Sequence, residues 1–178
     1  YVICPTRRSL VLISRLFALS IAITFIAVPA SAQQQQQLTN IQSSQNGDWT
    51  MKCGDVPNGG RLCEMTQVIN NPRDGKPVMQ AAVIKPPGER GALLRFIAPL
   101  GIWLRPGISL SIDGAQAQQM DFAFCLRQGC IAQMPLSEAL VNSMKRGSAG
   151  TVTLQNIRRQ KLEFKISLSG FTAGYDLL

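Results

Sequence analysis

The sequence contains no histidine among its 178 residues. This absence removes the usual general base of enzymes, the Ser-His-Asp and Cys-His arrangements of nucleophilic catalysis, and the commonest protein ligand of transition metals. Catalysis by lysine or by a pair of carboxylates remains possible. The ten acidic residues are scattered, however, mostly in predicted turns or on predicted solvent faces. We therefore predict no catalytic residues, no metal site and no cofactor.

Nucleotide-binding motifs are also missing from the sequence. It has no G-x-x-x-x-G-K-[ST] loop, no G-x-G-x-x-G after a predicted strand and no calcium-loop pattern. Aromatic residues make up only 6% of the chain, and they fall in segments predicted to form the core. A nucleotide-dependent enzyme and a nucleic-acid partner are therefore both disfavoured.

A long apolar run, residues 16–28, follows Arg7, Arg8 and Arg15 and precedes the small-residue sequence Ala30-Ser31-Ala32. A basic start, an apolar run of this length and an A-x-A end are typical of a cleavable secretory signal peptide. We predict a signal peptide over residues 1–32. A retained membrane anchor is the alternative, but the run is shorter than the roughly 20 residues that span a bilayer. The expected location is the periplasm or cell envelope, with no stable transmembrane span after cleavage.

Cleavage after Ala32 would reduce the net charge from +8 to +5, because three arginines leave with the signal peptide. It would also remove Cys4 and leave Cys53, Cys63, Cys125 and Cys130. Four cysteines in an oxidising compartment predict two disulfides, for which three connectivities exist. Loop-closure entropy favours partners that are near in sequence, so we expect Cys53–Cys63 and Cys125–Cys130.

Two other roles for these cysteines are weighed against disulfides. A four-cysteine zinc site fits poorly, because the two pairs do not both have the usual C-x₂₋₄-C spacing. Thiol exchange usually requires C-x-x-C at a helix N-terminus, where the thiolate is stabilised. Cys125 and Cys130 instead flank four residues between apparent strands. A structural staple of a hairpin is therefore the better interpretation.

Residues 33–47 begin with five consecutive glutamines and stay polar, so we predict a disordered leader there and a single folded domain over 48–178. Within the domain, apolar residues mostly recur at period two between turn sequences rich in glycine and proline. The predicted strands are 49–53, 61–69, 77–84, 92–98, 108–112, 120–125, 151–157 and 162–168. This pattern predicts a mainly β fold, an antiparallel β-sandwich or barrel-like domain.

Residues 135–147 break the alternation. Leu136, Leu140, Val141 and Met144 form one helical stripe, a proline opens the segment, and Gly147 can cap it. We predict one short helix there.

The C-terminal third of the chain is basic, and it suggests a surface for an anionic lipid, a glycan or the acidic patch of a partner. The candidate residues are Lys145, Arg146, Arg158, Arg159, Lys161 and Lys165. A solvated sheet edge, on which lysine discourages strand pairing, is the simpler interpretation. Trp49 and Trp103 could line a ligand site, but each lies among alternating apolar residues, which favours the core or its rim.

Several short motifs occur in a characteristic order between about Gly47 and Phe171. They are Gly47-Asp48-Trp49-Thr50-x-x-Cys53, Cys63-Glu64-Met65, Pro99-Leu100-Gly101-Ile102, Pro106-Gly107, Ile112-Asp113-Gly114, Cys125-x₄-Cys130 and Gly170-Phe171. In this order they resemble the invasion-associated locus B family of exported bacterial proteins. The resemblance implies a periplasmic or envelope-associated protein, from a family named for a role in host-cell invasion in some pathogens. It does not imply an enzymatic activity or a cofactor, and no catalytic residues can be carried over to this sequence.

The sequence as a whole therefore predicts a non-enzymatic envelope protein that acts by binding an envelope protein, a host protein or an anionic surface. An envelope enzyme, carbohydrate-active or thiol-redox, is the second hypothesis. A purely structural envelope component is the third.

Overall fold

The computed structural model describes residues 38–57 and 59–178. The predicted signal peptide and the glutamine run lie outside the described residues. Within the described part, neither helix is long and apolar enough to cross a membrane.

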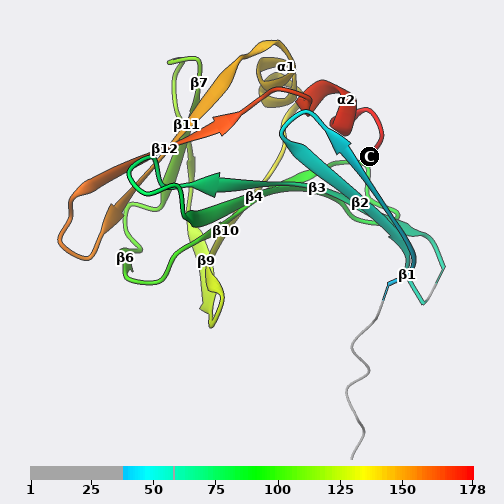
Figure 1. Cartoon of the computed structure of the whole chain (residues 1–178), viewed down its shortest axis with the longest axis horizontal. Helices are drawn as coiled ribbons and strands as arrows, with labels where there is room; N and C mark the ends of the chain where they lie inside the picture. The colour runs from blue at the N-terminus through cyan, green and yellow to red at the C-terminus, as the bar shows by residue number, and fades with distance from the viewer. Residues whose placement is uncertain (1–37, 58) are drawn as a thin grey trace, which may run out of the picture. The chain divides into compact units, whose positions relative to one another are not determined.

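The described chain forms two antiparallel sheets (Figure 1). The larger sheet has seven strands, in the order β1 (Thr39–Asn46), β2 (Trp49–Asp55), β3 (Arg61–Asn70), β4 (Pro77–Lys85), β5 (Leu93–Ala98), β10 (Gly129–Pro135) and β9 (Phe122–Leu126). The smaller sheet has the order β12 (Lys161–Ser167), β11 (Ala149–Asn156), β7 (Ile108–Ile112) and β8 (Gln118–Met120), and β6 (Ile102–Trp103) also pairs with β11. Neither sheet closes into a barrel among the described residues. The predicted mainly β, sandwich-like fold is confirmed.

Alternating side chains from both sheets form one continuous core. In β7, for example, Ile108, Leu110 and Ile112 are buried while the two serines between them are half-exposed. The same alternation recurs in β3, β5 and β11. Trp49, at the start of β2, is fully buried, which confirms its predicted place in the core.

The predicted disordered leader is wrong for its second half, because residues 39–46 form β1. This strand pairs along its length with β2 across the two-residue turn Gly47-Asp48, and Gly47 has a φ of +55°. An edge strand exposed on both faces is stabilised mainly by backbone hydrogen bonds and needs no apolar side chains, so composition alone suggested disorder. The folded domain therefore includes residues from Thr39 on, ahead of the expected start at Asp48.

The predicted strand at 120–125 is in fact two strands in different sheets. Met120 ends β8 in the smaller sheet, and Phe122 begins β9 in the larger one, so the chain changes sheet at Asp121. The sequence also failed to predict β6 and β10. Four consecutive residues at the start of β10 are buried, so this strand shows no alternation for the pattern to detect.

Two helices occur in the described part, where one was predicted. The first, α1 (Glu138–Arg146), begins later than expected: Pro135 belongs to β10, and Ser137 is the N-cap, whose side-chain oxygen accepts a hydrogen bond from the Leu140 N–H. The second, α2 (Phe171–Tyr175), has only five residues and follows Gly170. Such a short helix depends on tertiary packing, here on the buried Phe171, and has little periodicity of its own.

Candidate functional site

The structure joins Cys53 to Cys63 and Cys125 to Cys130, the two pairings expected from loop closure. Each disulfide links residues that lie directly opposite each other on adjacent strands, β2 with β3 and β9 with β10. Neither lies at a helix N-terminus, and no group of three or more candidate ligands in the described residues could hold a metal ion. Both disulfides therefore act as hairpin staples.

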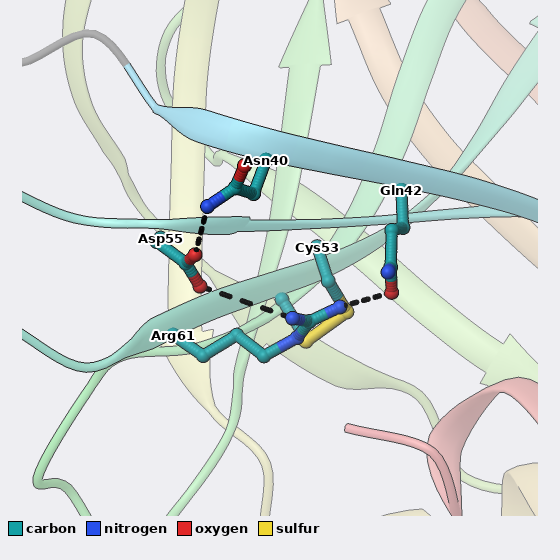
Figure 2. A network of polar contacts seen from close by, with 6 residues as sticks. Asn40, Gln42, Cys53, Asp55 and Arg61 are labelled. Carbon is teal, nitrogen blue, oxygen red and sulfur yellow. Dashed lines mark hydrogen bonds and ion pairs between the residues drawn. A yellow bond between two sulfur atoms is a disulfide. The ribbon is translucent and has the colours of Figure 1, made fainter.

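A hollow of about 530 Å³ lies beside the Cys53–Cys63 disulfide. Figure 2 shows the polar contacts next to this disulfide. Arg61 donates to Gln42 and lies 3.8 Å from the Asp55 carboxylate, which also accepts a hydrogen bond from Asn40 at 2.8 Å. These contacts connect β1 to β2 and β3. Each is solvent-exposed and contributes little alone. The network therefore explains how the polar edge strand is held, and it brings no nucleophile or acid–base pair together.

The six predicted basic residues do not form one surface. Lys145 and Arg146 end α1, next to the start of β11, whereas Arg158, Arg159 and Lys161 lie at the turn between β11 and β12. β11 has eight residues, which separates its two ends by about 25 Å at the usual rise per residue. Figure 1 shows α1 near one end of the orange hairpin and β6 near the other.

The end that carries α1 and α2, which we call the anchored end, uses its lysine in structural contacts. Lys145 forms an ion pair with Asp176 and lies 5.1 Å from the ring centroid of Tyr175. The Lys145 carbonyl accepts a hydrogen bond from the Thr172 hydroxyl. On β12, Lys165 similarly donates to the Thr151 hydroxyl at 2.7 Å. Both lysines therefore hold elements together, and the charge of Lys145 is paired with the Asp176 carboxylate.

The opposite end of the hairpin is different, because β6 brings large apolar side chains beside the basic turn. Trp103 pairs with Gln155 of β11, and the Ile157 N–H donates to the Gly101 carbonyl at 3.2 Å. The Arg159 guanidinium lies 4.8 Å from the centroid of the Trp103 ring. We call the resulting cluster the basic–aromatic tip, and it consists of Leu100, Trp103, Leu104, Arg105, Ile157, Arg158 and Arg159.

All seven residues of the basic–aromatic tip are exposed. The exposed fractions of its apolar residues are 57% for Leu100, 38% for Trp103, 49% for Leu104 and 66% for Ile157. Isolated exposed apolar residues are normal on protein surfaces, but four in one cluster are unusual and indicate an interaction surface. The prediction that Trp103 belongs to the core or its rim therefore holds only in the sense of an exposed rim.

Asn156 fixes the shape of the turn that presents the arginines. Its side-chain oxygen accepts hydrogen bonds from the N–H groups of Arg158 and Gln160, at 2.9 and 3.0 Å. Arg159 adopts a φ of +60°, a left-handed conformation that non-glycine residues rarely take. Side-chain bonds to the local backbone stabilise such turns. The position of Arg159 over Trp103 is thus set within the free protein.

The charges at the basic–aromatic tip are largely unneutralised. Lys161, which follows the turn, pairs with Glu163 at 2.7 Å, and this hydrogen bond lowers the pKa of Glu163 below its ordinary value. None of the ion pairs found among the described residues involves Arg105, Arg158 or Arg159. Arg159 therefore lies over Trp103, and Arg105 and Arg158 adjoin the apolar residues in the chain, all three without an acidic partner among the described ion pairs.

Sequence reasoning found only part of this cluster. Arg158 and Arg159 are predicted as surface residues. Trp103 is weighed as a ligand-site residue but placed in the core or its rim, Ile157 is assigned to a strand, and Leu104 is given no role. A cue was available: residues 100–105 place large apolar side chains between Pro99 and Pro106, where a loop would otherwise be polar. Their partner across the sheet could not be recognised without the pairing of β6 with β11.

Comparison with known proteins identifies relatives over nearly the whole described domain. The family described as "Invasion associated locus B (IalB) protein" matches residues 49–178. The chain belongs to this family. It is 31% identical over 166 residues to an invasion protein B homolog of Brucella abortus strain 2308, and these residues cover 89% of this chain and 93% of the homolog. A homolog from Brucella abortus biovar 1 has the same values.

The locus B family fold is also known from a solved structure. The crystal structure of invasion associated protein B from Bartonella henselae matches with a TM-score of 0.64 at 18% identity, covering 76% of this chain and 93% of that one. At this identity the match supports the fold alone. The family resemblance is confirmed, and membership supports an invasion-associated role. Together with the two disulfides, it also supports export to an oxidising compartment.

Proposed function

We propose that this locus B family protein is a non-enzymatic protein of the periplasm or cell envelope that acts by binding, with the basic–aromatic tip as its binding site. The observation that carries the proposal is the pair Trp103 and Arg159: the guanidinium lies over the indole ring, and further exposed apolar residues adjoin the pair in the chain. Tryptophan and arginine are enriched among the residues that contribute most to binding energy. A fixed turn presents Arg159 and the pairing of β6 with β11 holds Trp103, so little conformational entropy is lost on binding.

The available chemistry supports a binding role over an enzymatic one. The chain has no histidine, and its two disulfides leave no free thiol among the described cysteines. The carboxyl groups with a shifted pKa, Asp113 and Glu163, both have a pKa below the ordinary value. A general acid at neutral pH requires a shift in the opposite direction.

Photo-crosslinking in the protein's own cells tests the proposed binding site. A photoreactive amino acid placed at Leu104 should yield a specific crosslinked product, and the same group at Ile41 on β1 is the matched control, since both positions are exposed. Adding Arg159→Gln to the Leu104 probe should reduce the yield. Equal products from Leu104 and Ile41 would contradict the proposal.

Thiol titration separates this proposal from a thiol-redox enzyme. The native, non-reduced protein should contain no titratable thiol from Cys53, Cys63, Cys125 or Cys130, because all four are in disulfides. Rapid modification of Cys125 and Cys130 under mildly reducing conditions, with Cys53–Cys63 intact, would instead favour redox chemistry.

A further inference from the structure

We propose that the basic–aromatic tip docks on the surface of an anionic lipid bilayer. This inference rests on the proposed function, since it names the partner of the same site. In this arrangement the side chains of Leu100, Trp103, Leu104 and Ile157 enter the headgroup region, and the surrounding arginines contact lipid phosphates.

The apolar part of the basic–aromatic tip matches the interface of a bilayer. Trp103 has a large apolar ring with one polar N–H, and such side chains favour the boundary between headgroups and acyl chains. Leu104 follows it in the chain, and Ile157 reaches the same place because its N–H bonds to Gly101. All are at least 38% exposed in the free protein, so docking would remove apolar surface from water.

The charged part of the basic–aromatic tip matches an anionic lipid surface. Arg105, Arg158 and Arg159 belong to the same short segments as the apolar residues and have no acidic partner among the described ion pairs. Guanidinium groups bind phosphate oxygens in a two-pronged geometry. Basic residues near an anionic membrane gain attraction that adds up over the cluster.

The shape of the basic–aromatic tip favours a bilayer over an acidic protein. The hollow beside Cys53–Cys63 and two further hollows beside α1 are lined by none of its residues. Its apolar residues instead lie on and beside the short strand β6 and at the end of β11, where they are exposed. A protein partner would need a complementary pocket for each of them, whereas a fluid bilayer accepts exposed apolar side chains and neighbouring cations together.

Vesicle binding tests the inference directly. The exported form of the protein should sediment with vesicles of equal parts phosphatidylglycerol and phosphatidylcholine, and should not sediment with phosphatidylcholine alone. Trp49 is fully buried, so Trp103 is the tryptophan accessible to a soluble quencher. Binding should shift its fluorescence to shorter wavelength and protect it from iodide.

Matched variants show whether the basic–aromatic tip is responsible. The double variant Arg158→Gln/Arg159→Gln should weaken binding to the anionic vesicles by at least about tenfold. The control Lys85→Gln/Arg90→Gln removes the same charge from exposed residues near the opposite end of β5. Trp103→Ser should weaken binding about tenfold, and Ile41→Ser is its control. The control variants should bind like the unaltered protein.

Each contrary result has a distinct meaning. Equal weakening by the two double variants would show attraction by net charge only, and would overturn docking through the tip. Failure of the unaltered protein to bind anionic vesicles would overturn the inference as well. If the Leu104 crosslinker then captured an acidic protein in cells, the proposed binding function would stand with a different partner. If it captured nothing specific, both proposals would fail.

Discussion

The two ends of the β11–β12 hairpin contain the same kinds of residue in different surroundings. Each end has a tryptophan, a cation over an aromatic ring, a glycine with positive φ and a carboxylate with a lowered pKa. At the anchored end these groups contact the core, the two helices and the backbone. At the basic–aromatic tip they face solvent.

The surroundings of a residue, more clearly than its type, show whether it stabilises the fold or is exposed for binding. Lys145 and Arg159 both lie over an aromatic ring, but Lys145 also pairs with Asp176, while Arg159 has no acidic partner in the described chain. A substitution at the anchored end should therefore reduce stability. Its counterpart at the tip should reduce binding and leave stability nearly unchanged.

The two tryptophans should show the largest contrast. Trp49 is fully buried, packs edge-on against Phe171 with 5.6 Å between ring centroids, and donates to the Ser167 carbonyl at 3.0 Å. Trp49→Ala should lower the free energy of unfolding by about 3–5 kcal/mol. Trp103→Ala should lower it by only about 1 kcal/mol, because Trp103 lies at the rim and is already 38% exposed. Urea unfolding with the disulfides intact measures both.

If Trp49→Ala does not fold, the smaller change Trp49→Phe still tests the contrast, since it loses the hydrogen bond and part of the packing. Equal losses of stability from Trp49→Phe and Trp103→Phe would contradict the division between an anchored end and a free tip.

Two glycines give the next largest contrast. Gly170 and Gly101 have nearly the same φ, +82° and +79°. A Cβ on Gly170 would lie 1.9 Å from the Asn46 carbonyl oxygen, whereas a Cβ on Gly101 meets no atom within 4 Å. Gly101→Ala should cost about 1–2 kcal/mol, the usual penalty of a left-handed conformation. Gly170→Ala should cost roughly 3 kcal/mol or more, because the backbone must also move.

Thermal unfolding of the two alanine variants measures this difference. Equal shifts of Tm would mean that the contact of Gly170 with the β1–β2 turn does not restrict this position, and that the anchored end is looser than its packing indicates.

The features that sequence predicted well are local ones. Strand alternation, as in residues 108–112, depends on neighbouring residues, and both disulfides join positions within single hairpins. The features that it did not predict depend on burial or on long-range pairing. β10 is buried on both faces, β1 is a polar edge strand, and α2 depends on the packing of Phe171.

The candidate site illustrates the same limit. Leu104 and Ile157 are far apart in sequence and come together only because β6 pairs with the end of β11. Conversely, Lys145 and Arg158 are close in sequence but lie at opposite ends of an extended strand. Net charge along the chain could indicate a basic region, but it could not indicate which of its charges share a surface.

The two cations should give a smaller contrast, which becomes clear only when stability and binding are both measured. Lys145→Gln removes the contacts with Asp176 and Tyr175 and should lower the free energy of unfolding by about 1 kcal/mol. It should not change the yield of crosslinked product from the Leu104 probe. Arg159→Gln should change the free energy of unfolding by less than about 0.5 kcal/mol and should reduce the yield of crosslinked product from the Leu104 probe. Loss of capture in Lys145→Gln would mean that the two ends act together.

The two carboxylates should show the smallest effect, visible as a dependence on pH and salt. The N–H groups of Ser148 and Ala149 lower the pKa of Asp113, which they bond at 2.9 and 3.0 Å, and Lys161 lowers that of Glu163. Because both pKa values fall on folding, each carboxylate contributes stability above its ordinary pKa, 3.8 for Asp113 and 4.5 for Glu163. That contribution is lost as the pH falls through the folded pKa.

Acidification below about pH 4.5 should therefore destabilise Asp113→Asn and Glu163→Gln less than it destabilises the unaltered protein.

Salt should distinguish the contribution of Asp113 from that of Glu163. Glu163 and Lys161 are both exposed, so high salt should screen their pair and remove most of the Glu163 contribution. Asp113 accepts from two backbone N–H groups at hydrogen-bonding distance, an interaction that salt screens much less. Urea unfolding between pH 3 and 6 measures both contributions in low and high salt. The difference in pH dependence between Asp113→Asn and the unaltered protein should persist in high salt. If both effects disappeared together, the backbone contacts of Asp113 would resist salt no better than the exposed Lys161–Glu163 pair.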